Sequence, residues 1–142
     1  KKRDKIEYMW RDVQRRANFY GFDAKVPAPY PLKQFDLANK VAILGKDQGW
    51  IKEYTVLTYK KWFLEHLEPG SEPNLSSTLR EIGLDAENII KLAQTDEIEQ
   101  KYLKNTEMAK NKGIFGSPTF IVENEVFWGD DRCEDAIKWL LK

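Results

Sequence analysis

The sequence has very few of the residues on which redox and metal chemistry depend. It holds one cysteine, Cys133, and one histidine, His66. A single cysteine excludes an internal disulfide and a Cys-x-x-Cys pair within these 142 residues. It also suits a reducing compartment, so we expect a cytoplasmic location. No cysteine or carboxylate pattern at metal-ligand spacing surrounds His66, so we predict no metal site and expect a partly exposed helix position.

Long apolar runs and an excess of one charge are also missing. No run approaches the roughly 18 apolar residues that span a bilayer, so we expect no membrane partner. The 23 basic residues equal the 23 acidic ones, which leaves no net field to attract a polyanion. A basic cluster at the N-terminus is interleaved with Asp4, Glu7 and Asp12, and no aromatic stacking platform accompanies it. We therefore expect no nucleic-acid partner.

Apolar residues recur at helical spacing through most of the chain, and turn residues separate the segments. The third helix carries apolar residues on much of its circumference, so we expect it to be central to a helical bundle. Its tryptophans and tyrosines are better explained by core packing than by a pocket for an aromatic substrate. The first predicted helix runs from near the start of the chain to Tyr20, the second from Leu32 or Lys33 to Leu44 with Gly45 as its stop, and the third from Gln48 to Leu67. A short helix follows over Leu75 to Ile82, and another begins after a cap at Asp85. A long helix then runs from Asp96 to about Asn111.

The segment Gly113–Arg132 carries the most chemical information. Two runs of β-branched and aromatic residues, 119–122 and 126–128, flank Glu123–Glu125, where Asn124 is best suited to a turn. This pattern predicts a β-hairpin. An isolated hairpin is marginal in water, so we expect an exposed sheet edge that needs further chain or a partner to cover it.

Ser117 and Pro118 stand directly before the first predicted strand. The position is compatible with a cis X-Pro bond or with an ordinary turn. In the cis form, the residue before the proline offers its backbone N–H and C=O to an extended, peptide-like ligand. Ser117 and Pro118 are therefore candidate binding residues.

A last helix follows the hairpin, with Ala136, Ile137 and Leu140 as its apolar stripe and Asp130 as its expected N-cap. Its N-terminus is a potential anion site. Taken alone, the adjacent Asp131 and Arg132 are better explained as a capping acid and a surface base than as binding residues. Cys133 lies among acidic residues that oppose thiolate formation, so a structural role is expected.

These residues together resemble a known family. Glycine, an aromatic residue, Gly-Ser-Pro-Thr-Phe, a hairpin and then Phe-Trp-Gly-x-Asp-Arg is similar to the C-terminal half of 2-hydroxychromene-2-carboxylate isomerases and kappa-class glutathione transferases. Lys5–Tyr8 with Asp12, Pro29–Pro31 and Lys104–Thr106 follow the family's order more weakly.

The resemblance implies an α/β, mostly helical fold of the thioredoxin-like, DsbA-like kind. Residues 1–142 would form one domain fragment, with a helical insertion over 13–93 and the C-terminal half of the thioredoxin-like fold over 94–142. Family members begin with a strand, a helix and a second strand. We expect these elements, and a catalytic serine at the end of the first strand, to precede Lys1.

The resemblance also implies glutathione as the cofactor. Ser117 and Pro118 would bind its peptide backbone, and Asp131 and Arg132 would hold its γ-glutamyl end. That group carries one ammonium and one carboxylate on the same carbon, so an acid and a base side by side suit it. Lys5 matches a family lysine that reaches toward the active site, although a solvated helix face explains it as well.

The function implied is glutathione-dependent isomerisation of 2-hydroxychromene-2-carboxylate type, or a kappa-class-like transfer, on a small aromatic or hydrophobic substrate. We expect a homodimer. No catalytic residue is assigned within these residues, so we expect residues 1–142 to be inactive alone. Two alternatives stay open: a DsbA-like thiol-disulfide oxidoreductase and a non-catalytic helical interaction module.

Overall fold

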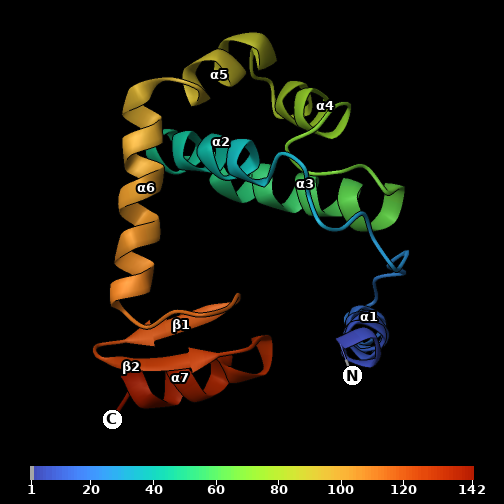
Figure 1. Ribbon diagram of the computed structural model, residues 1–142, viewed down its shortest axis with the longest axis vertical. Coiled ribbons are helices and arrows are strands. Elements are labelled where there is room, and N and C mark those ends of the chain that lie inside the picture. The colour runs from blue at the N-terminus through green and yellow to red at the C-terminus, as the bar shows by residue number, and fades with distance from the viewer. Residues whose placement is uncertain (1) are drawn as a thin grey trace. The chain divides into compact units, whose positions relative to one another are not determined.

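The computed structural model describes residues 2–142, and it forms two compact units, one up to Glu99 and one from Gln100 on. The elements in Figure 1 are α1 (Lys2–Phe19), α2 (Phe35–Gln48), α3 (Ile51–Glu65), α4 (Asn74–Glu81), α5 (Ala86–Ala93), α6 (Asp96–Asn111), β1 (Thr119–Val122), β2 (Glu125–Trp128), the 3-10 turn η1 (Asp130–Arg132) and α7 (Cys133–Leu140).

The core of the first unit lies between α2, α3, α4 and α5 (Figure 1). Helix α2 packs against α3 and α5, and α4 packs against the same two helices. Asp85 caps α5 as predicted, because its carboxylate accepts a hydrogen bond of 3.1 Å from the backbone N–H of Asn88. The buried cluster consists of Val41, Leu44, Tyr54, Leu75, Leu79, Ala86, Ile89, Ala93 and Ile98.

Helix α3 buries fewer apolar side chains than its sequence indicates. It buries Tyr54, Thr58 and Lys61, whereas Val56 and Tyr59 are exposed. The Lys61 ammonium is compensated by Glu81 of α4, at 2.5 Å. Polar pairing at the α3–α4 contact therefore replaces part of the apolar packing that we expected.

Helix α3 ends one residue before His66. His66 takes the left-handed conformation that closes the helix, so it is a C-cap residue and not part of the helix. Its Nε2 atom lies 2.8 Å from the carbonyl oxygen of Lys25. His66 is exposed, as predicted, and it serves as a structural link in this unit.

The prediction that Gly45 stops α2 was wrong. The helix continues to Gln48, and Gly49 is the left-handed C-cap, its N–H donating to the carbonyl oxygen of Gly45 over 2.9 Å. Gly45 is buried, and a Cβ there would lie 2.8 Å from the ring of Trp50. Gly45 therefore allows the Trp50 ring to pack closely against the helix, and it does not end the helix.

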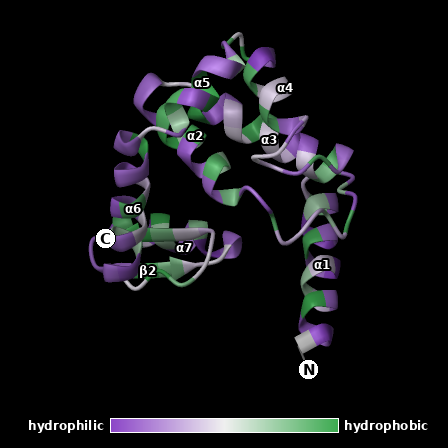
Figure 2. Cartoon of the chain, turned by 45° about the horizontal axis from the view of Figure 1, so that its top comes forward, coloured by the Kyte–Doolittle hydropathy of each residue, from purple (hydrophilic) through white to green (hydrophobic). Residues whose placement is uncertain are grey.

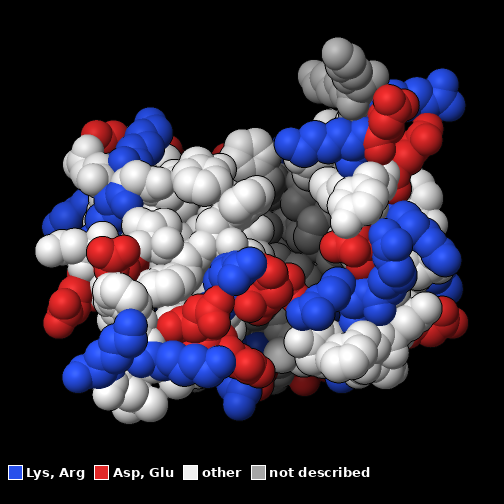
Figure 3. Space-filling model, turned by 90° about the horizontal axis from the view of Figure 1, so that it is seen from below, with Lys and Arg blue, Asp and Glu red and all other residues white. Residues whose placement is uncertain are grey.

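The surface mixes both charges and both polarities. Hydrophobic and hydrophilic residues alternate along α1 (Figure 2), and Lys and Arg are interspersed with Asp and Glu on the face drawn in Figure 3. No helix among the described residues is long and apolar enough to cross a membrane. Within the same residues, no group of three His, Cys, Asp or Glu side chains is arranged to hold a metal ion.

The second unit contains the predicted hairpin. Strands β1 and β2 pair antiparallel, with Thr119 opposite Trp128 and Phe120 opposite Phe127, and α7 packs against both strands (Figure 1). The ring of Phe127 lies 6.3 Å from that of Trp139 in α7. The hairpin loop consists of Glu123 and Asn124, so Asn124 lies in the turn as predicted, and Glu123 has a positive φ of 55°.

Candidate functional site

The loop before β1 has an open backbone. The Ser117–Pro118 peptide bond is cis, which is one of the two forms that the sequence left open. The Thr119 hydroxyl donates to the carbonyl oxygen of Gly116 over 2.6 Å, which braces the loop from its C-terminal side. Within residues 2–142, the backbone N–H and C=O of Ser117 pair with no other group. They are therefore available to an extended ligand.

A backbone hydrogen bond joins this loop to the turn that follows β2. The N–H of Gly129 donates to the carbonyl oxygen of Pro118 over 3.0 Å. This bond extends the ladder by one step beyond the pair of Thr119 and Trp128. The structure thus brings the segment Ser117–Pro118 beside the segment that carries Asp131 and Arg132.

Asp131 and Arg132 lie in the turn η1, and both side chains are more than half exposed, at 60% and 53%. The Arg132 guanidinium is 3.6 Å from the Asp131 carboxylate and 2.9 Å from that of Asp135. Gly129 makes this arrangement possible, because its φ is 122° and a Cβ there would lie 2.5 Å from Asp131 Oδ1. The Asp131 carboxylate lies close to the Gly129 backbone.

The N-terminus of α7 differs from the prediction. Asp130 opens η1 and is not the N-cap of the helix; α7 begins at Cys133, and Arg132 occupies the capping position without a side-chain capping bond. The intervening 3-10 turn moves the N-cap position by two residues, from Asp130 to Arg132. The first backbone N–H groups of α7 are therefore left without a side-chain cap, which suits an external acceptor.

The charge balance at this turn is acidic. Asp130, Asp131, Glu134 and Asp135 surround a single base, Arg132. Such a site favours a cationic group near Asp131. A carboxylate would depend on Arg132 and on backbone N–H groups, which together offset part of the acidic field.

Two exposed aromatic side chains flank the same loop. The rings of Phe115 and Trp128 lie 5.0 Å apart in an edge-to-face arrangement, with 74% and 55% of these residues exposed. Gly116 allows this contact, since a Cβ there would collide with Nε1 of Trp128. The loop therefore combines open backbone groups with an aromatic surface.

Four of the five predicted site residues lie together at this loop, and the structure places further residues beside them. Asp135 was not recognised as a partner of Arg132, although the spacing of three residues at a helix start is the signal that identifies it. The roles of Gly129 and Trp128 depend on hairpin register. Lys5 lies in α1 of the other compact unit, so its assignment rests on the sequence alone. Cys133 is half-buried at the first position of α7.

The fold and this loop define the class of the protein. A family model described as DSBA-like thioredoxin domain matches residues 2–138, and the chain belongs to this family. The predicted DsbA-like thioredoxin fold is thereby confirmed. A solved structure of a selenomethionine-labelled 2-hydroxychromene-2-carboxylate isomerase superimposes with a TM-score of 0.82 at 23% identity, covering 98% of this chain and 68% of that one.

Curated relatives carry the same name as that structure. The chain is 25% identical over 137 residues to the 2-hydroxychromene-2-carboxylate isomerase of Sphingobium xenophagum, a match that covers 96% of this chain and 69% of the relative. It is 23% identical over 128 residues to the isomerases of Pseudomonas putida and Pseudomonas sp. strain C18. Those matches cover 90% of this chain but only 62% and 59% of the relatives.

Proposed function

We propose that the protein carrying this chain is a glutathione-dependent isomerase of 2-hydroxychromene-2-carboxylate type, acting on a small aromatic or hydrophobic substrate. The names of the curated relatives support the reaction class. The observation that carries the glutathione subsite is the Gly129–Pro118 hydrogen bond, which sets the open backbone of Ser117 beside Asp131 and Arg132. A kappa-class-like glutathione transferase would use the same subsite.

The residues present fit glutathione group by group. The cysteinyl part would add to the hairpin edge through the N–H and C=O of Ser117. The γ-glutamyl ammonium would lie against Asp131, and its carboxylate would accept from Arg132 and the uncapped N–H groups of α7. The assignment of Lys5 to the site stays a prediction from the sequence. Phe115 and Trp128 would offer an aromatic surface beside the subsite.

When bound, glutathione would supply a thiolate that adds reversibly to the unsaturated substrate and permits rotation about the former double bond. The described residues bind and orient in this proposal; no thiol-activating role is assigned to them. We therefore propose that residues 1–142 alone bind glutathione without turnover. The homodimer and the cytoplasmic location stay predictions.

The test is an absorbance assay of 2-hydroxychromene-2-carboxylate conversion by the protein, with and without glutathione. The proposal expects turnover with glutathione and none with S-methylglutathione, which occupies the site but has no free thiol. Conjugation of glutathione to a chlorodinitrobenzene without isomerisation would favour the transferase. Isomerisation at an unchanged rate without glutathione would contradict the glutathione dependence.

A further inference from the structure

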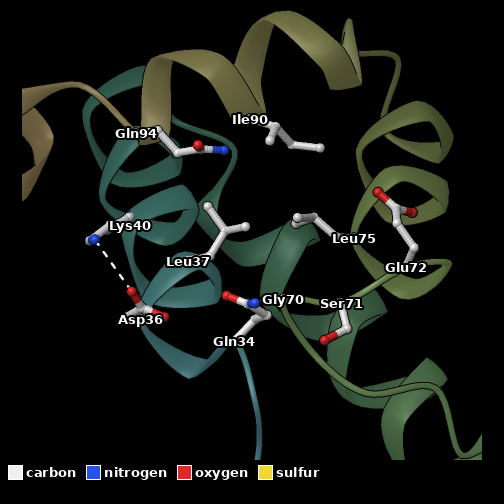
Figure 4. Close-up of a pocket in the computed structure, with 10 residues that line it drawn as sticks. All are labelled: Gln34, Asp36, Leu37, Lys40, Gly70, Ser71, Glu72, Leu75, Ile90 and Gln94. Carbon is white, nitrogen blue, oxygen red and sulfur yellow. Dashed lines mark hydrogen bonds and ion pairs between the residues drawn. The ribbon is translucent and has the colours of Figure 1, made fainter.

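A pocket of about 610 Å³ lies in the first compact unit, between the start of α2, the loop before α4, and α5 (Figure 4). Its volume is within the range of small-molecule sites, which is about 300–1,000 Å³. None of its lining residues belongs to the candidate glutathione subsite. They are Gln34, Asp36, Leu37, Lys40, Gly70, Ser71, Glu72, Leu75, Ile90 and Gln94.

The floor of the pocket is apolar. Leu37 of α2, Leu75 of α4 and Ile90 of α5 point toward one another in Figure 4. Leu75 is buried, whereas Leu37 and Ile90 remain half-exposed at the pocket surface. A ligand with an apolar body would cover Leu37 and Ile90 and remove their exposed apolar area from water.

One positive charge near the pocket is already neutralised. The Lys40 ammonium lies 3.4 Å from the Asp36 carboxylate (Figure 4). It also forms an ion pair with Glu99. Only 13% of the Lys40 side chain is exposed. Lys40 is therefore poorly suited to attract an anion, because two carboxylates hold its ammonium.

The carboxylate of Glu72 lies on the other side of the apolar floor (Figure 4). Its oxygens accept hydrogen bonds from the Ser76 hydroxyl and, at 3.4 Å, from the Ser76 backbone N–H. No lysine, arginine or histidine among the described residues forms an ion pair with it. A carboxylate has about four lone-pair positions, so this oriented group retains capacity for a cationic donor.

Contacts of backbone groups hold the pocket wall between Lys40 and Glu72. Gly70 is buried with φ of 74°, and a Cβ there would collide with the carbonyl oxygen of Gln34. The backbone N–H of Lys33 donates to Glu68 in the same region. The loop before α4 is thus fixed to the start of α2, which preforms the pocket.

We propose that this pocket binds a small organic ammonium ion with an apolar body. The apolar part would cover Leu37, Leu75 and Ile90, and the ammonium would donate to Glu72. The amides of Gln34 and Gln94 and the hydroxyl of Ser71 supply neutral donors and acceptors at the rim. The inference is independent of the proposed isomerase activity, because it uses none of the residues assigned to glutathione.

The test is a titration of the protein with benzylamine, followed by ¹H–¹⁵N NMR, with benzyl alcohol as the uncharged probe of nearly the same shape. We expect benzylamine to bind with a dissociation constant of roughly 1 mM, as is typical of a ligand this small. Shifted amides should be confined to the start of α2, residues 70–75 and α5. Benzyl alcohol should bind at least about fivefold more weakly, because it cannot form the charge-assisted hydrogen bond to Glu72.

Matched variants separate the pocket from general surface effects. Glu72→Gln keeps an acceptor for Ser76 but removes the charge, and it should weaken benzylamine about fivefold or more. Ile90→Ala should weaken both probes. Glu87→Gln and Leu92→Ala, on the same helix α5 but outside the lining, should change neither. Equal binding of both probes, shifts elsewhere, no binding at all, or full affinity in Glu72→Gln would each overturn the proposal.

Discussion

The backbone N–H of Gly129 donates a 3.0 Å hydrogen bond to the carbonyl oxygen of Pro118. This one bond connects the loop before β1 with the turn after β2. It depends on Gly129, because the residue has φ of 122° and the Asp131 carboxylate lies where a Cβ would be. The geometry of the candidate glutathione subsite therefore depends on a residue that itself presents no side chain.

Gly129→Ala should lower the free energy of unfolding by about 1–3 kcal/mol, through backbone strain and the contact with Asp131. Urea denaturation measures this change. Gly113→Ala is the matched control, because Gly113 has φ of 71° but nothing within 4 Å of a Cβ, so only the conformational cost of about 1 kcal/mol applies. An equal loss in both variants would show that the Asp131 contact is unimportant.

Glu81→Gln should destabilise the protein by roughly 1–3 kcal/mol, because it leaves the Lys61 ammonium, only 9% exposed, without its carboxylate. Glu81 itself is 55% exposed, which keeps the loss below that of a fully buried pair. Glu7→Gln removes the exposed pair with Arg3 and should cost under about 0.5 kcal/mol. Chemical denaturation measures the loss of unfolding free energy in each variant. Similar losses in both variants would contradict the claim that the Glu81 pair matters more because Lys61 is buried.

The buried Tyr54 predicts a loss of stability at alkaline pH. Burial raises the pKa of its hydroxyl from 10.0 to about 12. Because the folded pKa is the higher one, the stabilisation is complete below pH 10 and is lost as pH rises toward 12. The loss should be on the order of 2–3 kcal/mol. Urea midpoints from pH 9 to 12 should fall more steeply for the wild type than for Tyr54→Phe, and parallel curves would contradict this explanation.

The ion pairs of Lys40 should also lose their stabilising effect at alkaline pH, but for a different physical reason. Its hydrogen bond to Glu99 raises the pKa of the ammonium above 10.5, with a smaller contribution from Asp36, while burial opposes the rise. The stabilisation from the ion pairs is therefore complete below pH 10.5 and is lost as pH rises through the raised value. The stability difference between wild type and Lys40→Met should be constant up to about pH 10.5 and shrink above that pH. A difference that is unchanged at high pH would exclude this contribution.

The sequence predicted the elements whose signals are local. The hairpin follows from alternating β-branched and aromatic residues, and the cap at Asp85 follows from its position before an apolar helix. Gly45 and Asp130 were misassigned because each has a local preference that the tertiary structure overrides. Gly45 provides space for Trp50, and the turn η1 shifts the start of α7.

Most of the candidate site could be predicted from a short motif, since Ser117, Pro118, Asp131 and Arg132 lie within sixteen positions of one another. Their proximity in space follows from the register of one hairpin. The pocket near Glu72 could not be predicted, because its floor comes from three helices. The packing of the three helices determines which of their side chains meet. No single residue spacing in the sequence indicates that packing.

The most direct test of the account is the affinity of the protein for glutathione, measured by isothermal titration calorimetry with Asp131→Asn, Arg132→Ala and Lys138→Ala. Lys138 is an exposed cation farther along α7 and serves as the control for charge. The account predicts that glutathione binds and that each change at the turn weakens it about tenfold or more, whereas Lys138→Ala does not. Undetectable binding by the wild type, or equal affinity in all four proteins, would contradict a glutathione subsite at this loop.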